Sequence, residues 1–507
     1  MKLRYPGMLH VVALAAFLGI WLSASGATRP PNVLLLMGDD HADYVYGAYG
    51  NPKARTPNLD RLAQSGVRFA RAFANCPMCT PSRQSLLTGR FPHSVGVTQL
   101  TTALSEEPVT LAELLKERGY ATAAIGKMHF NSDLKHGFDL LVDTREHREY
   151  LKEHPPRPVP EGLEVLPDWK PFKDPARIWL NGSYLPYGAY DEDMECTWFA
   201  KKAKEFLMSP REAPFFLVVS FRQPHSPFNF PVEYAGMFDP TTFEVPPVGP
   251  EDDWQIPEIF RDLTPSEKQR IAASYYTATA FLDTNIGRVL DALDEAGLAE
   301  ETFVIYLGDQ GYHLGHHGRF EKHSLYERAV KAPLVMRLPG TTGRGQAKEA
   351  LVEFIDLFPT VAEVCGATCP EEVEGKSLLP LLAGKQKDSR ESVFSEYLEN
   401  EEAMIRTDRY KYIYTSGKRE RQDGYRTGRP LPGRRRILFD LKEDPEEMRN
   451  IASDPEHAAL IAALEAEMLR RFEESYPEDR GTPPEGLEGS DLLDWYLVPR
   501  DESKTSG

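Results

Sequence analysis

Residues 31–40 read PNVLLLMGDD, a short apolar run that ends in two aspartates. Three later runs have the same form: YATAAIG at 120–126, PFFLVVSF at 214–221 and TFVIYLG at 302–308. Continuous apolar runs of this length are typical of strands buried on both faces. Between them, apolar residues recur at helical spacing at 110–120 and 280–298. This alternation predicts an α/β fold with a large mixed, mostly parallel sheet flanked by helices.

Polar side chains follow each of the four runs. They are Asp39 and Asp40 after the first, Lys127 and His129 after the second, His225 after the third, and Asp309 with Gln310 after the fourth. Singly, such residues are common in turns, helix caps and ordinary hydrogen bonds. Because ligands bind where the carboxyl ends of parallel strands meet, four such ends together predict a site. Carboxylate and amide oxygens suit a hard divalent cation, calcium before magnesium.

Residues 1–27 have the layout of a cleavable signal peptide. A basic stub precedes an apolar run from about Met8 to Leu22, and the small residues SASGA follow. The run is about 15 residues long, shorter than the roughly 20 that a membrane-spanning helix needs. We therefore expect an exported protein, periplasmic or secreted, with no stable membrane insertion once the signal is removed.

Net charge and cysteine count argue against two further classes of protein. The formal charge of −18 disfavours a nucleic-acid-binding protein, which needs a basic face. Five cysteines are too few for a disulfide scaffold and odd in number, so at least one does something other than pair internally. The sequence leaves the pairing of Cys76, Cys196, Cys365 and Cys369 open.

Apolar periodicity gives way to charge near residues 381–392, which indicates a domain boundary. We expect a catalytic domain at 28–385 and a C-terminal α+β subdomain with a tail at 386–507. The patterns there predict a small antiparallel sheet with a helix packed on it, its strands including 392–397 and 411–415 and its helix spanning 457–472.

A cysteine opens a helix-like stretch, NCPMCTPSRQSLLTGR, at residues 75–90. Thr80 is a plausible N-cap, Pro81 suits the first helical position, and Gly89 can end the helix. Cys79 would then lie at a helix N-terminus, which is a natural anion site, with Arg83 one turn along to clamp an oxyanion. The chemistry of this stretch should therefore involve an anionic group.

These residues resemble the sulfatase family. CTPSR followed by QSLLTGR is similar to the family signature Cys-x-Pro-Ser-Arg…Thr-Gly-Arg, and GYATAAIGKMH is similar to its second signature. Further similar stretches are PNVLLLMGDD, TPNLDRLAQSGVRF at 56–69, GDQGYHLGHHGRFEKHSLYE at 308–327 and LFDLKEDPEEMRNIA at 438–452. The resemblance implies an alkaline-phosphatase-like fold, a calcium ion, and Cys79 converted to formylglycine by a formylglycine-generating or equivalent maturation enzyme.

The resemblance also implies a mechanism for sulfate ester hydrolysis. A thiol attacks sulfur poorly, whereas a hydrated aldehyde carries two hydroxyls on one carbon. One hydroxyl attacks sulfur and expels the alcohol; the other then loses its proton, and the aldehyde and free sulfate are released.

Each site residue receives a role from the same resemblance. The metal ligands would be Asp39, Asp40, Asp309 and Gln310 together with the modified residue 79. Arg83 and Lys127 would stabilise the hydrate and the sulfate charge, and His129 would assist the elimination. The substrate would be bound by Lys127, His225 and Lys322, of which His225 and Lys322 would also help the leaving alcohol. Gln310 departs from the Asn or His usual in the family, which puts its ligation in doubt. Lys331 is a less favoured substitute for Lys322.

Three other functions compete with a sulfatase. CPMC (76–79) is formally a Cys-x-x-Cys redox motif, but nothing else indicates a thioredoxin-like domain. A phosphodiesterase or phosphonate monoester hydrolase could use the same scaffold and nucleophile. A non-catalytic binder of sulfated glycans is disfavoured because every catalytic position is filled.

A basic run at residues 417–436 holds eight Lys or Arg against two acids. Such a run is usually solvated surface. In an acidic protein it can instead attract a polyanion, with Arg434, Arg435 and Arg436 as the residues to neutralise in a test. This favours a sulfated carbohydrate as the substrate; the sugar and the sulfate position are not encoded in a recognisable motif.

Overall fold

A computed structural model of the chain describes residues 30–170, 175–340, 343–419 and 424–501. The predicted signal peptide, 1–27, lies outside these residues. Within them, no helix combines the length and the apolar character needed to cross a membrane.

The strand formed by the opening stretch, β1 (Asn32–Asp39), lies in the middle of an eight-stranded sheet of order β4-β3-β5-β1-β6-β7-β2-β8. It pairs in parallel with β5 (Phe215–Pro224) and β6 (Thr302–Gly308). The other strands are β2 (Val67–Phe73), β3 (Ala121–Gly126), β4 (Leu140–Val142), β7 (Leu334–Arg337) and β8 (Ala347–Glu353). Only the pairings of β7 are antiparallel in this sheet, so the predicted mixed, mostly parallel sheet is confirmed.

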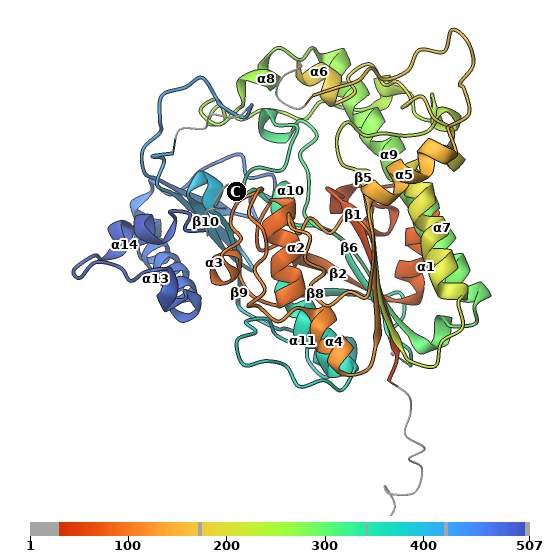
Figure 1. The fold of residues 1–507 in the computed structure, drawn as a ribbon. Coiled ribbons are helices and arrows are strands. Elements are labelled where there is room, and N and C mark those ends of the chain that lie inside the picture. Colours follow the sequence, from red (N-terminus) through yellow and green to blue (C-terminus); the bar gives the residue numbers. More distant parts are fainter. Residues whose placement is uncertain (1–29, 171–174, 341–342, 420–423, 502–507) are drawn as a thin grey trace, which may run out of the picture.

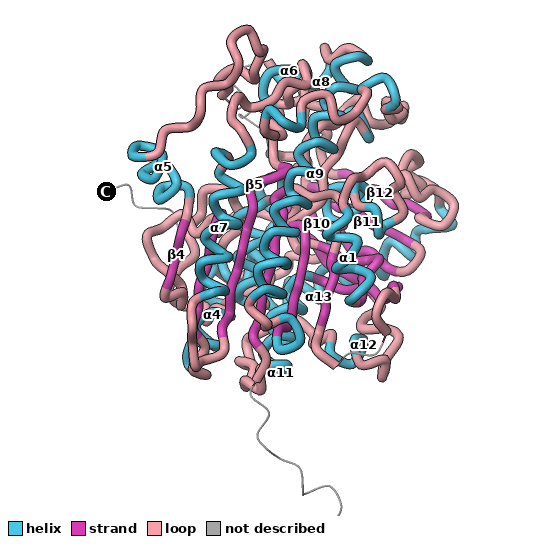
Figure 2. Tube along the Cα trace, turned by 90° about the vertical axis from the view of Figure 1, so that its right-hand side faces the viewer, coloured by secondary structure: helices cyan, strands magenta, loops and turns pink. Residues whose placement is uncertain are grey.

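Helices cover both faces of the sheet (Figure 1). On one face lie α1 (Pro57–Ser65), α7 (Glu195–Met208) and α9 (Pro265–Glu295), which Figure 2 shows in front of the strands. On the other face lie α2 (Cys79–Thr88), α4 (Leu111–Glu117) and α11 (Leu357–Val364). Alternate residues of β1 pack into the two resulting cores: Leu34 into the first and Leu35 into the second. Other helices in this part of the chain are α3 (Pro92–Val95), α5 (Thr144–Glu153), α6 (Ala176–Trp179), α8 (Glu258–Arg261), α10 (Glu327–Val330) and α12 (Leu379–Leu382).

The helix predicted at 280–298 is the second half of α9, which begins much earlier. Thr264 caps it, with its hydroxyl accepting from the backbone N–H of Glu267 while the Glu267 carboxylate accepts in return, and Pro265 occupies the first turn. This capping box fixes the start.

A second sheet is antiparallel, with the order β12-β11-β10-β9. Its strands are β9 (Ser392–Tyr397), β10 (Glu402–Thr407), β11 (Tyr410–Thr415) and β12 (Arg435–Asp440). Apolar residues of α13 (Ala458–Ser475) and α14 (Gly489–Tyr496) form one core with this sheet. The predicted small sheet with a packed helix is therefore confirmed, while the boundary at 385/386 stays a prediction.

Arg390 joins the two sheets. It lies just before β9 and forms ion pairs with Glu353 at the end of β8 and with Asp356, all three side chains being 2% exposed or less. The other Glu353 oxygen accepts the backbone N–H of Phe394 in β9 at 2.7 Å. A buried cation thus bridges two carboxylates at the junction.

We expect Arg390→Ala to lower the free energy of unfolding by about 3–5 kcal/mol, because it leaves two buried carboxylates with only the more distant Arg471, 3.8 Å from Glu353, as a counter-charge among the described residues. Arg409→Ala is the matched control, since its pair with Asp440 is half exposed and should be worth about 1 kcal/mol or less. Urea unfolding of both variants measures the difference. If both variants lost the same free energy of unfolding, the buried ion pairs of Arg390 would contribute no more than an exposed pair.

Candidate active site

Four parallel strand ends meet at one edge of the large sheet, as the sequence predicts. β3, β5, β1 and β6 are neighbours in that order, and they are followed by Lys127, His225, Asp40 and Asp309 respectively, with Asp39 as the last residue of β1. Gly126, at φ 102°, has no room for a side chain, because a Cβ there would lie 1.9 Å from the carbonyl oxygen of Ser220. The close approach of β3 and β5 therefore fixes the position of the Lys127 backbone at the end of β3.

Cys79 lies at the N-terminus of α2, but the helix starts two residues earlier than the sequence predicts. Met78 is the N-cap and Cys79 the first helical residue. The proposed cap Thr80 instead donates its hydroxyl to the carbonyl oxygen of Leu100 at 2.8 Å, and Pro81 is tolerated in the first turn because N–H groups there need no helical partner. Gly89 ends the helix at φ 68°, as predicted.

The Cys79 thiol is 1% exposed and has charged neighbours. Its sulfur lies 3.3 Å from Asp39 Oδ1, 2.8 Å from Lys322 Nζ and 3.3 Å from Gln310 Nε2. Burial and the Asp39 carboxylate raise the pKa of the thiol to about 12. The thiol is therefore protonated at neutral pH and is a poor nucleophile.

Arg83 connects α2 to the strand ends. Its guanidinium donates to Asp309 Oδ2 at 2.8 Å, to the Ser220 hydroxyl at 2.7 Å and to the carbonyl oxygen of Lys127 at 2.5 Å. Its remaining nitrogen, Nη2, is 3.4 Å from Asp39 Oδ1 and makes no hydrogen bond within the described part of the chain. One donor of a buried guanidinium is thus left facing the site.

Asp39, Asp40 and Asp309 bring one carboxylate oxygen each within 4.8 Å of one another. All three are at most 1% exposed. Burial disfavours the charged form of Asp39, yet Lys127, whose Nζ is 2.6 Å from Oδ2, and other cations hold its pKa well below the usual range. Burial raises the pKa of Asp309 to about 7. The cluster has oxygen donors crowded together, as a hard divalent cation requires.

Gln310 lies in this cluster and fits a cation. Its Nε2 donates to Asp40 Oδ1, and its Oε1 is buried without a hydrogen-bond partner among the described residues. Rotating the amide by half a turn exchanges the two atoms and aims the oxygen at the carboxylates, where a cation would accept it. The donor set of three carboxylates and one amide thus suits calcium; the longer side chain does not keep Gln310 out of the site.

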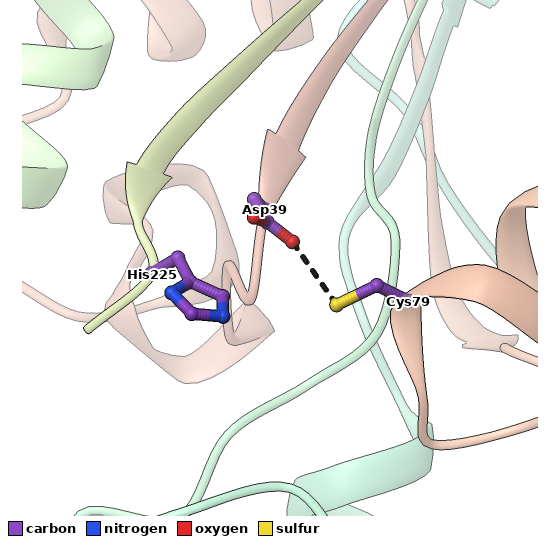
Figure 3. A group of neighbouring side chains, drawn as sticks. All are labelled: Asp39, Cys79 and His225. Atoms are coloured by element: carbon purple, nitrogen blue, oxygen red, sulfur yellow. Dashed lines mark hydrogen bonds between the residues drawn. The ribbon is translucent and has the colours of Figure 1, made fainter. Parts of the chain in front are cut away.

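His129 and His225 approach from the neighbouring strand ends. Burial, with Lys127 and Arg83, lowers the pKa of His129 to about 2, and its Nδ1 is buried without a partner in the described structure. Burial lowers the pKa of His225 to about 4. The His225 Nδ1 bonds to the Ser226 carbonyl oxygen at 2.7 Å, which leaves Nε2 directed at the site, 3.8 Å from Asp40 Oδ2. Figure 3 shows His225 and Cys79 flanking Asp39.

Lys322 occupies the position expected of it, and Lys331 does not. Lys322 Nζ contacts both Asp40 and Cys79, and its side chain is 7% exposed. Lys331 Nζ is instead 3.2 Å from Asp43. The side chain of His225 is 28% exposed, so it lies nearer the entrance than Lys322 does.

Three contributors were not identified from the sequence: Ser220, Ser82 and Tyr275. Ser220 accepts from Arg83, and Ser82 donates to the carbonyl oxygen of Asp309 at 2.5 Å. Tyr275 in α9 donates to the carbonyl oxygen of Asp40 at 2.5 Å and accepts from the N–H of Ala42 at 2.8 Å. Ser82 lies in the CTPSR motif, which is a usable signal, whereas Tyr275 sits in an ordinary helical pattern.

The part of the basic run expected to attract a polyanion is largely committed to other contacts. Arg434 pairs with Asp491 and with Asp494 at 2.6 Å, and Arg436 pairs with Glu465 at 2.7 Å. These acids belong to α14 and α13. Arg434 and Arg436 thus have counter-charges within the protein and join the C-terminal helices to β12, which argues against a role in attracting a polyanion; that role stays an untested prediction.

All five cysteines are free thiols. The Cys76–Cys79 pair is therefore not a disulfide in this structure, and the redox hypothesis gains no support.

Models of two protein families match this chain, and both describe enzymes that act on sulfate groups, as the geometry of the site suggests. The model described as Sulfatase matches residues 31–367, and that for the C-terminal part of N-sulphoglucosamine sulphohydrolase matches residues 315–474. The chain belongs to the sulfatase family. The predicted enzyme class, a sulfuric ester hydrolase, and the predicted alkaline-phosphatase-like fold are both confirmed.

Two relatives and one solved structure show the extent of the similarity. The N-acetylglucosamine-6-O-sulfatase of Bacteroides thetaiotaomicron is 26% identical to this sulfatase over 539 residues, which covers 90% of this chain and 89% of that protein. Iduronate 2-sulfatase of Homo sapiens is 30% identical over 410 residues, covering 74% and 72%. The phosphonate monoester hydrolase of Silicibacter pomeroyi has a TM-score of 0.73 at 25% identity, covering 88% of this chain and 96% of that one.

We expect Asp39→Asn and Asp309→Asn to lose bound calcium in titration calorimetry, because each removes a charged ligand. Gln310→Ala should weaken binding less, since it removes a neutral ligand. Asp283→Asn is the control, a buried carboxyl that caps α1 through the N–H groups of Asn58 and Leu59; it should keep the ion. If Asp309→Asn bound calcium as tightly as the wild type, the assignment of Asp309 as a calcium ligand would be wrong.

Proposed function

We propose that this sulfatase hydrolyses a sulfate ester on a carbohydrate, with residue 79 as formylglycine and with a calcium ion. The supporting observation is a group of buried polar atoms that make no hydrogen bond with the described residues: Arg83 Nη2, His129 Nδ1 and Gln310 Oε1. Proteins rarely leave such atoms unpaired. Their position beside residue 79 and three carboxylates suits a bound cation and an anionic substrate.

A calcium ion and the formylglycine at position 79 would supply the reactive chemistry. A calcium ion, held by Asp39, Asp40, Asp309, Gln310 and residue 79, would act as a Lewis acid that favours ionisation of a hydroxyl and offsets charge on sulfate oxygens. Formylglycine, as its hydrate, would supply the hydroxyl nucleophile that the protonated thiol cannot provide.

The chain's own residues orient and stabilise the reacting groups. Arg83 Nη2 and Lys127 Nζ are placed to donate to an anion near residue 79, where fixed donors in a dry site stabilise developing charge. The depressed pKa of His129 keeps its ring neutral, with a lone pair free to accept a proton. Negative charge on a bound sulfate would offset the effect of Lys127 and Arg83 and raise this pKa, so that the ring could accept the proton that the elimination releases.

The leaving alcohol needs a proton donor near the entrance. His225 is more exposed than Lys322 and has its Nε2 directed at the site. With its pKa lowered to about 4 and its Nδ1 proton donated to the Ser226 carbonyl oxygen, the ring without substrate is neutral and has no proton on Nε2. We assign the transfer to His225 in the substrate complex, where the negative charge of a bound sulfate ester would raise its pKa and favour a proton on Nε2. Lys322, in contact with Cys79 Sγ and Asp40, is placed to bind the bridging oxygen beside the nucleophile.

A carbohydrate substrate is supported by relatives named as sulfatases of N-acetylglucosamine and iduronate. Phosphonate monoester hydrolysis is the second candidate, since an enzyme with that name shares the fold at a TM-score of 0.73. Catalysis is favoured over mere glycan binding by the complete set of polar groups around residue 79. Export, processing at 1–27, maturation by a separate enzyme and the division into 28–385 and 386–507 remain parts of this proposal.

Mass spectrometry of the tryptic peptide 72–83 tests the nucleophile. In active protein, Cys79 should show the mass change from thiol to aldehyde, while Cys76 in the same peptide stays a thiol that alkylates and serves as the internal control. Full sulfatase activity from protein with two alkylated cysteines would refute the formylglycine proposal.

The substrate class is tested by comparing kcat/KM for a sulfated monosaccharide with that for a phenyl phosphonate monoester. We expect the sulfate ester to be preferred. A chelator should abolish its turnover, and added calcium should restore it. Preference for the phosphonate would favour the second candidate, and turnover of neither ester would favour a binding protein.

Leaving-group dependence tests the acid. A sugar alkoxide needs a proton as it leaves, and a positioned acid contributes about 10²- to 10⁴-fold, whereas nitrophenolate leaves without one. His225→Ala should therefore slow a sugar sulfate far more than nitrophenyl sulfate, and Arg83→Ala should slow both alike. If Lys322→Ala showed the selective loss instead, the acid would be the lysine.

A further inference from the structure

A cavity of about 610 Å³ lies next to the proposed catalytic centre, and the chemistry above does not use it. Its lining includes His323 and Ser324, which directly follow Lys322 in the chain. Consecutive Cα atoms are about 3.8 Å apart. The cavity therefore begins one residue away from the lysine that touches Cys79, and its volume lies in the range of small-ligand sites.

Three separate parts of the chain build the walls. One is the segment with Trp254 and Glu258, the second is the 319–326 segment, and the third is the small sheet with the connection between β11 and β12. The proposed catalytic groups come from the strand ends of the large sheet, from α2 and from Lys322, and none of them is in the lining of the cavity. The cavity is therefore a distinct place for another part of the same ligand.

Residues 425–429 are fixed to the first wall by several contacts. Arg426 Nε is 3.0 Å from Glu258 Oε2, and the carbonyl oxygen of Arg426 accepts the N–H of Glu258 at 3.0 Å. Arg429 pairs with Asp253 at 2.7 Å. The Tyr425 ring packs on His323 with 4.4 Å between centroids. The described part of this connection is thus a built wall of the cavity.

The arginines that line the cavity differ in how their charge is compensated. Arg319, Arg426 and Arg429 each form an ion pair with an acid. Arg419 forms none with the described residues; its one hydrogen bond there is a long one, 3.5 Å from Nη1 to the carbonyl oxygen of Leu398. Arg419 thus contributes a half-buried cation available to a ligand.

We propose that this cavity binds a neighbouring, anionic sugar unit of the substrate chain, and that Arg419 contacts its sulfate or carboxylate group. The inference rests on the proposed function, which puts a sulfated carbohydrate at residue 79. Aromatic side chains with a few placed polar groups, here Trp254, Tyr425 and Arg419, are the usual lining of a ligand site, and a guanidinium binds sulfate or carboxylate with paired hydrogen bonds.

Binding calorimetry tests the cavity apart from catalysis. The protein is the calcium-loaded Cys79→Ala variant, and the probes are size-defined tetrasaccharides of heparin, chondroitin sulfate and carrageenan with their sulfated monosaccharides. At least one tetrasaccharide should bind more tightly than its monosaccharide, and Arg419→Gln should weaken that binding about tenfold or more, as expected for a charged hydrogen bond. Arg449→Gln, an exposed arginine outside the lining, should change nothing.

A second pair of variants guards against misfolding of Arg419→Gln. Leu431 lines the cavity and is 51% exposed, so substitutions there leave the core intact. Leu431→Glu should weaken tetrasaccharide binding and Leu431→Lys should not. Repeating the titration with desulfated heparin and chondroitin tetrasaccharides, which keep their carboxylates, tells which anion is bound.

Two results would overturn the inference: no tetrasaccharide gain in any of the three series, or equal losses from Arg419→Gln and Arg449→Gln. Either could occur while the wild-type protein still turns over sugar sulfates, which would leave the proposed function intact. Conversely, absence of all sulfate ester turnover would remove the proposed function, even if the cavity bound a glycan.

Discussion

Three carboxylates buried together at the ends of β1 and β6 can stay charged only if cations reach them. Arg83 comes from α2, Lys127 from the end of β3, and Lys322 from the segment after β6, and each touches at least one of the aspartates. Burial multiplies both the repulsion within the cluster and the attraction to the cations. The position of α2 over the sheet edge, and with it the position of residue 79, depends on this balance.

The large sheet and most of the site follow from the sequence because their signals are local. Strands covered on both faces must be continuously apolar, so 32–37 and 302–308 stand out from their surroundings. Parallel strands place their carboxyl ends together, so the polar residues that follow them can be grouped before any contact is known. The motif CTPSR located Cys79 and Arg83, although the first turn of α2 was placed two residues late because Met78, which has no capping side chain, starts the helix.

Other features depend on contacts between distant segments, which leave no local pattern. Tyr275 holds the Asp40 backbone from inside a long helix, where an aromatic residue looks like any core position. Arg434 and Arg436 belong to a basic run, and only the fold reveals that acids of α13 and α14 neutralise them. Charge counted along a sequence thus overstated the charge free to meet a ligand. Arg419 in the same run differs, since it forms no ion pair with the described residues.

The central position of β1 also constrains the order in which the chain can fold. Val33 pairs with Phe216 on one side and with Phe303 on the other, so the first strand to be synthesised remains without its full ladder until the chain has extended to β6. Loop closure over such separations is slow, and an apolar strand with open edges invites aggregation meanwhile. The residues that make β1 the axis of the finished sheet therefore leave an apolar strand of the nascent chain without its partners until the segment that forms β6 has been synthesised.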